Sequence, residues 1–403
     1  FHFGFVDGIY LKYGGKTLGK TVDKSFATDL STMTVFQLII SCVTLFVAVI
    51  LKDKILVFFA LSILPQNMGN YFKFLYQATG EFTLYGKAMN LTTISTFALN
   101  MFLLFVVKTD DIVWYVLGYV VLYFGVWIVL EVYFRAKHTI EKGNLFLMNV
   151  LLDNVKSGFL LTLGNLSSIF LTSMDRWFVK GLMDTLAFAQ YSFAVSVENF
   201  LNLAITPVTT TLYNYFCREE RPEAHKDAYN YVALFAVVVP AAAFPVKFIL
   251  KILFGIVNIF IFRYSEPVIF FLFSAQIFYT IIRSIYVNLY KVQRKQKVYF
   301  TKLIFVLLVG FITNCACFAV VHVKESFAVG TLISAIVWYF ISETDFRYLK
   351  IKIKTKAFLF VELLSFLFFG LKVDSAVYGC IAYMLITIIM SFVLMQDTMI
   401  KIS

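Results

Sequence analysis

The chain has 403 residues, of which 60% are hydrophobic and 15% charged, and its mean hydropathy is +0.82. A soluble domain carries roughly 25% charged residues, so this composition excludes an ordinary soluble globular protein. Uncharged runs of about 18 residues or more recur along the chain and predict membrane-spanning helices. The runs are too long for membrane strands and lack a period-2 alternation.

Thirteen apolar segments follow one another along the chain. In chain order, the predicted spans are residues 1–10, 32–51, 55–77, 88–107, 111–133, 157–181, 187–216, 229–255, 267–290, 298–321, 326–343, 357–371 and 375–395. The first reads as the end of a helix whose start is absent, so we expect a missing first helix. The segment 357–371 is short for a span.

Lysine and arginine residues are concentrated in every second connection between these spans. The net charge is +11, and the basic connections include residues 12–24, 135–142, 291–297 and 347–356. The positive-inside rule makes this side cytoplasmic. The charge therefore has a membrane explanation, and no nucleic-acid partner is needed.

The sequence predicts an all-α polytopic membrane protein with two six-helix lobes around a central cavity. "LYQATGEFTLY" at 75–85 and "LYKVQRKQKVY" at 289–299 share a pattern, which is either a chance match or the mark of two parallel halves. We expect an N-terminal lobe at 1–133, a cytoplasmic linker at 134–156, a C-terminal lobe at 157–346 and an extra C-terminal transmembrane pair at 347–403. The linker contains "LFLMNVLLDNV", which has the pattern of an amphipathic interfacial helix.

Polar residues recur at steps of three and four within four of the spans. The stripes are Gln66, Asn70, Lys73 and Gln77; Asn165, Ser168, Thr172 and Asp175; Ser192, Ser196, Asn199, Asn202 and Thr206; and Gln276, Thr280 and Arg283. Such stripes either line a wet cavity or join helices by hydrogen bonds. Four stripes, two of them with a cation, favour a cavity. Pro207 is expected to kink the third of these helices.

Charged residues inside the spans lie at different depths. Glu198 lies near the midplane, where an ionised side chain is costly. Arg283 lies deeper toward the cytoplasm, and Lys73 is close enough to that end to snorkel. Asp175 and Arg176 lie near the outer face, and adjacent helical residues point about 100° apart, so the two cannot pair and face one cavity together. Arg176 shares its face with Lys180.

No residue pattern in the sequence indicates catalysis or metal binding. The five cysteines and four histidines lack metal-ligand or catalytic spacing, and the pair Cys315 and Cys317 has no nearby partner. We therefore predict no catalytic residues, no metal and no cofactor.

One long stretch, residues 154–216, resembles a known family. It reads "NVKSGFLLTLGNLSSIFLTSMDRWFVKGLMDTLAFAQYSFAVSVENFLNLAITPVTTTLYNYF". It is similar to the seventh and eighth helices of the Wzx-type polysaccharide repeat-unit flippases, of the multidrug/oligosaccharidyl-lipid/polysaccharide exporter superfamily. The family pattern of Asp-Arg, Tyr-Ser and Pro falls on Asp175, Arg176, Tyr191, Ser192 and Pro207. "FGFVDGIYLKYGG" at 3–15 and "ILFG" at 252–255 resemble further family segments.

The resemblance implies a bacterial inner-membrane flippase that moves undecaprenyl-diphosphate-linked oligosaccharide by alternating access, for cell-surface polysaccharide biosynthesis. A diphosphate crossing lipid needs cations, and sugars need polar walls. The predicted substrate-binding residues are Arg283, Lys73, Arg176, Asn70, Gln276, Thr280, Asn165, Asn199 and Asn202. Coupling to H⁺ or Na⁺ would use a titratable acid, for which Glu198 and Asp175 are the candidates. The expected partners are the lipid-linked substrate and membrane lipids.

Two other classes of function stay open at this point, a different transporter and a membrane enzyme. A cation-coupled multidrug exporter of the same superfamily would prefer an acidic cavity, so the cations argue against it. A membrane polysaccharide polymerase would be expected to have a large outer loop, and the predicted outer connections are short. An acyltransferase would need a histidine paired with an acid, which the histidine positions do not supply.

Overall fold

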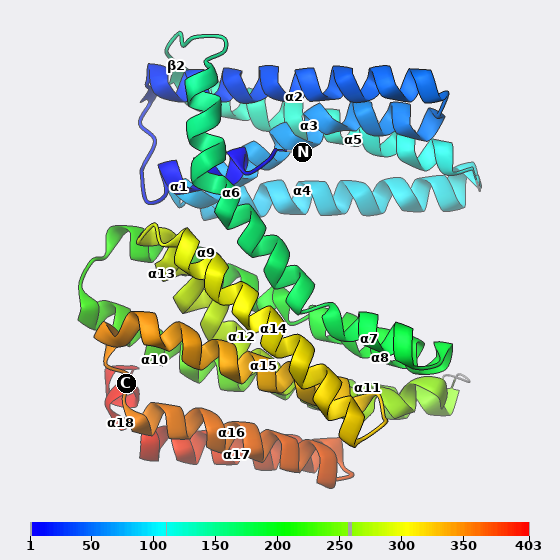
Figure 1. Ribbon diagram of the computed structural model, residues 1–403, viewed down its shortest axis with the longest axis vertical. Coiled ribbons are helices and arrows are strands. Elements are labelled where there is room, and N and C mark those ends of the chain that lie inside the picture. Colours follow the sequence, from blue (N-terminus) through cyan, green and yellow to red (C-terminus); the bar gives the residue numbers. More distant parts are fainter. Residues whose placement is uncertain (1, 110, 257–259, 403) are drawn as a thin grey trace. The chain divides into compact units, whose positions relative to one another are not determined.

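The computed structural model describes residues 2–109, 111–256 and 260–402 and consists almost entirely of helices (Figure 1). Ten helices within the described residues are long and apolar enough to cross a membrane. The predicted all-α polytopic fold is therefore confirmed. The chain divides into two compact units, Phe1–Leu163 (unit 1) and Gly164–Ser403 (unit 2).

Unit 1 is a helical bundle built on α3. Its elements are α1 (Phe5–Tyr13), β1 (Thr21–Val22), α2 (Lys24–Leu51), α3 (Lys54–Thr79), α4 (Phe82–Met101) with a π-helical turn (Phe102–Val107), α5 (Ile112–Lys137), β2 (Thr139–Ile140) and the first part of α6 (Met148–Leu171). Helix α3 packs against α1, α2, α4 and α5, and the four long helices α2 to α5 run alongside one another in Figure 1. The strands form one short parallel pair, Thr21 with Thr139 and Val22 with Ile140.

Aspartate caps begin three of the long helices of unit 1. Asp23 accepts a hydrogen bond from the backbone nitrogen of Phe26 (3.2 Å), and Asp53 accepts from that of Ile55 (2.9 Å). Asp111 does the same for Val113 (3.0 Å). Each cap satisfies a backbone donor that has no partner within the helix, which fixes where these spans start.

Glycines let α1 and the first part of α6 approach each other closely. A Cβ at Gly158 would lie 2.0 Å from the carbonyl oxygen of Gly4 and 2.3 Å from the nitrogen of Gly8, so any larger residue would force the helices apart. Asp7, buried between them, accepts a hydrogen bond from Thr162 (2.5 Å). Residues 134–163 are thereby held to the first helices of unit 1.

Unit 2 contains the rest of the helices. They are the end of α6, α7 (Met174–Leu182), α8 (Thr185–Asn199), α9 (Asn202–Arg218), α10 (Pro222–Val238), α11 (Ala243–Ile256), α12 (Glu266–Ile281), α13 (Val287–Val292), α14 (Gln296–Val320), α15 (Glu325–Glu343), α16 (Ile353–Lys372), α17 (Ala376–Leu394) and α18 (Gln396–Ile402). A π-helical turn (Ile282–Tyr286) joins α12 to α13, and 3-10 turns lie at Val239–Ala242, Phe260–Ser265 and Thr344–Leu349.

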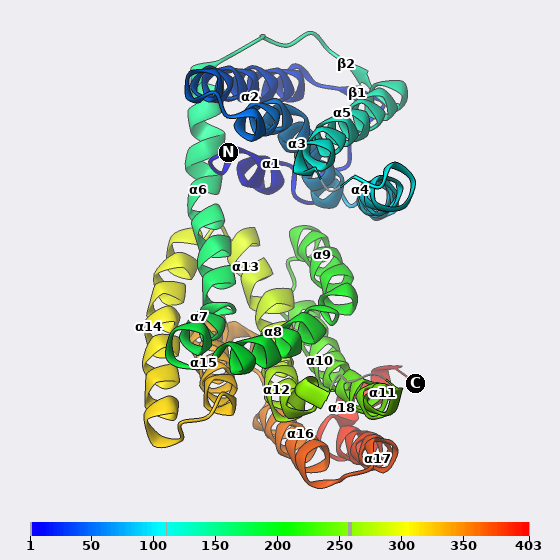
Figure 2. The ribbon, with the colours of Figure 1, turned by 90° about the vertical axis from the view of Figure 1, so that its right-hand side faces the viewer.

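Helix α12 is the centre of unit 2. It packs against α8, α10, α15 and α16, which surround it in Figure 2. In the helical segment Phe262–Val292, which contains α12, 89% of the most apolar 18-residue stretch is buried within the chain. In α14 the corresponding share is only 22%. A helix that is apolar on all sides lies in the interior of a bundle, and a lipid-facing helix keeps its apolar side chains exposed. Helices α16 and α17 form a hairpin against this core.

The two similar stretches noted in the sequence adopt the same turn. After α3, the nitrogen of Gly80 donates to the carbonyl of Gln77 and that of Glu81 donates to Tyr76 (2.9 Å). After α13, the nitrogen of Arg294 donates to Lys291 and that of Lys295 to Tyr290 (2.8 Å). Both are Schellman motifs with a residue of positive φ, +79° at Gly80 and +53° at Arg294. Each unit thus contains the same helix-ending turn.

Several predicted boundaries differ from the structure. The linker segment at residues 148–154 is not a separate interfacial helix, because α6 runs without a break from Met148 to Leu171. The predicted span 157–181 is interrupted between α6 and α7, and the span 187–216 is interrupted between α8 and α9. The second interruption precedes Pro207 by one to two turns, where a proline ring clashes with the preceding turn of its helix.

Candidate functional site

A polar cavity of about 490 Å³ lies within unit 2. Helices α6, α7, α8, α9, α12, α13 and α14 contribute to it, together with the π-helical turn between α12 and α13. Its lining residues are Asn165, Ser168, Ile169, Thr172, Ser173, Arg176, Val195, Glu198, Asn199, Asn202, Thr209, Gln276, Arg283, Val287, Lys291 and Tyr299. We call this the unit 2 cavity. Seven of the predicted site residues line it: Asn165, Arg176, Glu198, Asn199, Asn202, Gln276 and Arg283.

The α6 wall shows how a sequence stripe becomes a cavity surface. Asn165, Ser168 and Thr172 follow one another at helical spacing and all line the unit 2 cavity. Beside them, the Tyr299 ring lies over Gly164, where a Cβ would approach within 2.4 Å of the ring. The absence of a side chain at Gly164 therefore gives the Tyr299 ring its place in the wall.

Glu198 is the acidic member of the cavity and is positioned by α12. Its Oε1 accepts a hydrogen bond from Nε2 of Gln276 at 2.6 Å. Glu198 belongs to the last turn of α8, just before the two-residue interruption, and Asn202 starts α9 just after it. The interruption thus presents Glu198, Asn199 and Asn202 to the same cavity.

Arg283 reaches the cavity from the π-helical turn after α12. Its Nη1 donates to Oδ1 of Asn202 at 3.2 Å, and its guanidinium lies 5.4 Å from the centre of the Tyr279 ring. Among the described residues Arg283 forms no ion pair. A guanidinium has five N–H donors, so most of its hydrogen-bonding capacity is available to an anionic ligand.

Asp175 and Arg176 point in different directions, as their adjacent positions on a helix require. Asp175 is 1% exposed and accepts hydrogen bonds from the Tyr191 hydroxyl (2.6 Å) and the Arg176 backbone nitrogen (2.7 Å). Arg176 instead lines the cavity, and its Nη2 donates to Ser173 at 2.9 Å. Asp175 therefore ties α7 to α8 inside the unit and is absent from the cavity wall.

A second, more apolar cavity of about 510 Å³ adjoins the first and shares Ile169, Ser173 and Arg176 with it. Apolar side chains make up most of its wall, including Leu166, Phe170, Trp177, Phe188 and Ile169. Lys180 lines it together with Arg176, the two residues that the sequence places on one helix face. Arg176 thus lies where the polar and the apolar cavity meet, and Lys180 lines the apolar cavity.

The remaining predicted residues lie elsewhere. Thr280 is wholly buried in α12, and its hydroxyl has no hydrogen-bond partner among the described residues. Thr280 packs in the interior of unit 2 and does not line the cavity. Asn70 and Lys73 are half-buried on α3 in unit 1, so they do not line the unit 2 cavity.

Sequence reasoning missed four polar residues of the unit 2 cavity, which are Ser173, Thr209, Lys291 and Tyr299. The sequence predicts Lys291 in a cytoplasmic connection, but in the structure it belongs to the last turn of α13 and lines the cavity with Arg283 and Val287. Arg283, Val287 and Lys291 are spaced by four residues. Extending the predicted span 267–290 by one residue would have included all three. Tyr299 begins a different helix, and no periodicity connects it to the others.

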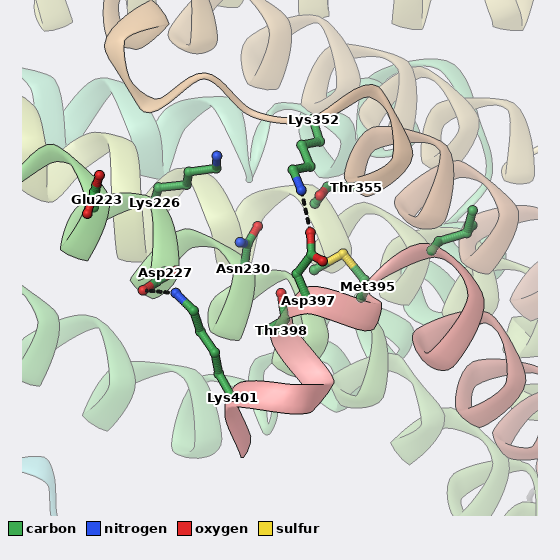
Figure 3. Close-up of a pocket in the computed structure, with 11 residues that line it drawn as sticks. Glu223, Lys226, Asp227, Asn230, Lys352, Thr355, Met395, Asp397, Thr398 and Lys401 are labelled. Carbon is green, nitrogen blue, oxygen red and sulfur yellow. Dashed lines mark hydrogen bonds and ion pairs between the residues drawn. The ribbon is translucent and has the colours of Figure 1, made fainter. Parts of the chain in front are cut away.

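Figure 3 shows a further polar pocket, of about 250 Å³, between α10, α16 and α18. Lys401 of α18 pairs with Asp227 of α10 at 2.6 Å, and Asp397 of α18 pairs with Lys352 just before α16. Both pairs are drawn in Figure 3. These two ion pairs attach the last helix to α10 and to the residue before α16.

The chain was compared with known proteins. No protein-family model and no curated protein matches it. Among solved structures, an outward-facing multidrug resistance MATE family transporter of the MOP superfamily aligns with a TM-score of 0.64 at 13% identity, covering 87% of this chain and 83% of that one. The lipid II flippase MurJ, in an inward closed conformation, aligns with a TM-score of 0.61 at 13% identity, covering 99% of this chain and 90% of that one.

These similarities establish the fold. The chain has the fold of MATE transporters and of the MurJ flippase. The matched structures are named as a transporter and as a flippase. The described residues contain no group of three or more His, Cys, Asp or Glu side chains placed to hold a metal ion.

Proposed function

We propose that the protein is a flippase that moves undecaprenyl-diphosphate-linked oligosaccharide repeat units across the bacterial cytoplasmic membrane by alternating access. The observation that carries the proposal is the charge of the unit 2 cavity. Arg176, Arg283 and Lys291 line it, against a single acid, Glu198. Cations within a membrane bundle are costly unless an anion accompanies them, and a diphosphate is such an anion.

The rest of the wall suits the other parts of this substrate. The amides of Asn165, Asn199, Asn202 and Gln276 offer both donors and acceptors for sugar hydroxyls. In this proposal, the start of the lipid tail occupies the apolar second cavity, and its phosphates bind Arg176 and Lys180. A cationic drug would meet repulsion from the same three cations, which disfavours the multidrug exporter although the fold occurs in both kinds of transporter.

Glu198 is the proposed coupling residue for H⁺ or Na⁺, since it is the acid that lines the cavity. Asp175 is the second candidate for ion coupling. It is adjacent to the cavity residue Arg176, and protonation would alter its hydrogen bond with Tyr191. Asn70 and Lys73 of unit 1 remain proposed contacts for the substrate in another stage of the cycle.

Arg283 provides the decisive experiment. We expect Arg283→Ala to reduce flipping of a lipid-linked oligosaccharide in reconstituted vesicles by about 10- to 100-fold, the worth of one charge-assisted hydrogen bond. Arg283→Lys should restore part of the rate, because it keeps the charge and loses the planar fork. Arg347→Ala, which removes an exposed arginine outside the cavity, is the matched control and should flip normally.

The same vesicles distinguish the two transporter functions. We expect the wild-type protein to show no transport of a cationic dye that depends on Arg283. Unchanged oligosaccharide flipping in Arg283→Ala would remove this residue from the site. Dye transport without any flipping would replace the flippase by the multidrug exporter.

A further inference from the structure

Glu362 is a further acidic side chain deep within the helices of unit 2, far along the chain from Asp175 and Glu198. It lies in the middle of α16 and has no exposed surface. Its Oε2 is 2.7 Å from Oγ1 of Thr387, which lies in the middle of α17. Its Oε1 has no hydrogen-bond partner among the described residues.

The polar side chains of α17 that face α16 already have their own acceptors. Tyr383, Thr387 and Ser391 are spaced by four residues and are all buried. The Tyr383 hydroxyl donates to the carbonyl of Val237 on α10 at 2.6 Å, and Ser391 donates to the carbonyl of Thr387 at 2.6 Å. Neither is therefore a donor to Glu362.

Among the described residues, no cation forms an ion pair with Glu362. Helices α10, α12 and α17 pack against α16. Helix α17 contains no Asp, Glu, Lys, Arg or His, α12 has only Glu266 at its first residue, and α10 has its charged side chains and His225 within residues 223–227. Tyr383, one turn before Thr387 on α17, is a phenol and carries no positive charge.

The hydrogen-bond geometry around Thr387 indicates which group donates the hydrogen in its contact with Glu362. The Thr387 hydroxyl has one hydrogen, yet its oxygen lies within hydrogen-bonding distance of both the Tyr383 carbonyl (3.0 Å) and Glu362 (2.7 Å). A carbonyl can only accept. Both contacts are satisfied when Thr387 donates to Tyr383 and a protonated Glu362 donates to Thr387. An ionised Glu362 would share one hydrogen with that carbonyl, which is a severe deficit for a buried carboxylate.

We propose that Glu362 is a proton-binding site of the α16–α17 hairpin, occupied at neutral pH, and that its proton joins the two helices through Thr387. Loss of the proton would place an unpaired carboxylate between α16 and α17 and loosen the hairpin. The direct contact between Glu362 and Thr387 leaves no room for a metal ion between them. Helix α12 packs against both α16 and α8, so a change at the hairpin reaches the helix whose Gln276 holds Glu198.

This proposal does not depend on what the protein transports, and infrared spectroscopy tests it on the purified full chain in lipid nanodiscs. At neutral pH, the difference between wild type and Glu362→Gln should show the loss of a carboxylic-acid carbonyl band. Thr387→Val should shift that band, and Thr387→Ser should leave it in place. The matched control is Glu343→Gln, whose carboxylate pairs with Lys356 and should show loss of a carboxylate band instead.

The pH dependence of thermal stability gives a second readout. An acid that must be protonated in the folded state stabilises least at high pH, so the melting temperature of wild type relative to Glu362→Gln should fall as the pH rises. Loss of a carboxylate band in Glu362→Gln at neutral pH, or parallel pH profiles of the two proteins, would overturn the proposal. A stabilisation of the wild type by sodium that Glu362→Gln lacks would make the site a cation site instead.

Discussion

Glu198 shows how much the position of a single carboxyl depends on its neighbours. It is held by Gln276 at 2.6 Å, and the cavity that it lines also contains Arg283. A carboxyl that faces a cavity can exchange a proton or bind a cation as that cavity opens, whereas Glu362 is enclosed between helices. Two acids within the same membrane bundle are therefore expected to behave differently.

The coupling role predicts a specific phenotype for Glu198→Gln. The amide keeps the shape and the hydrogen bond to Gln276 but cannot titrate, so transport should continue without responding to an imposed pH or sodium gradient. Gradient-driven flipping in vesicles measures this. The control is Glu131→Gln, whose carboxylate pairs with Arg135 at 2.7 Å in unit 1. A Glu198→Gln protein that responds to gradients like the wild type would leave Glu198 as a structural hydrogen-bonding residue.

At the scale of helices, irregular segments bring polar residues into the unit 2 cavity. The interruption at Phe200–Leu201 is a tightened turn in which the nitrogen of Leu203 donates to the carbonyl of Phe200 (3.1 Å). The π-helical turn at Ile282–Tyr286 contains Arg283. Such departures from α-helical geometry are common at functional sites. Here they lie on facing helices, joined by the contact between Thr209 and Ser284 (2.8 Å).

The last helix, α18, gives a prediction about pH. Hydrogen bonding from Lys352 lowers the pKa of the Asp397 carboxyl, and hydrogen bonding to Asp227 raises the pKa of the Lys401 ammonium. The contribution of Asp397 is complete above its unfolded pKa and is lost as the pH falls through the folded value. The contribution of Lys401 is complete below its unfolded pKa and is lost at strongly alkaline pH.

Attachment of α18 should therefore be greatest near neutral pH. The double variant Asp397→Asn, Lys401→Gln should increase proteolytic cleavage between α17 and α18 a few-fold, because exposed ion pairs contribute modestly. Wild type should approach the same cleavage rate in acid or at high salt. Lys297→Gln, an exposed lysine on α14, serves as the control. Equal cleavage of the double variant and wild type at neutral pH would show that packing alone holds α18.

At the scale of the whole molecule, the basic connections predict the orientation of the chain in the membrane. A cysteine replacing Lys142, in the exposed connection before α6, should react with an impermeant maleimide only from the cytoplasmic side. A cysteine replacing Lys108, in the exposed turn before α5, should react only from outside. The experiment uses a background without the five native cysteines. Labelling of both positions from one side would contradict the assignment.

The sequence by itself determined the class of protein and much of its local structure. Long uncharged runs predict spanning helices because a backbone in lipid must satisfy its own hydrogen bonds. Periodicity placed Asn165, Ser168 and Thr172 on one face, and they line one cavity. The sequence also placed Arg176 and Lys180 together. These are properties of single helices, in which neighbours along the chain are neighbours in space.

Only the tertiary structure decided which polar residues share a cavity and which are enclosed. Thr280 belongs to the same stripe as Gln276, yet it is buried because α12 is surrounded by other helices. Tyr299 enters the wall because Gly164, far away in sequence, leaves space for its ring. Glu362 meets Thr387 through the packing of a hairpin, which no periodicity encodes. Contacts between helices depend on their phase and packing, and these are fixed only when the whole bundle has formed.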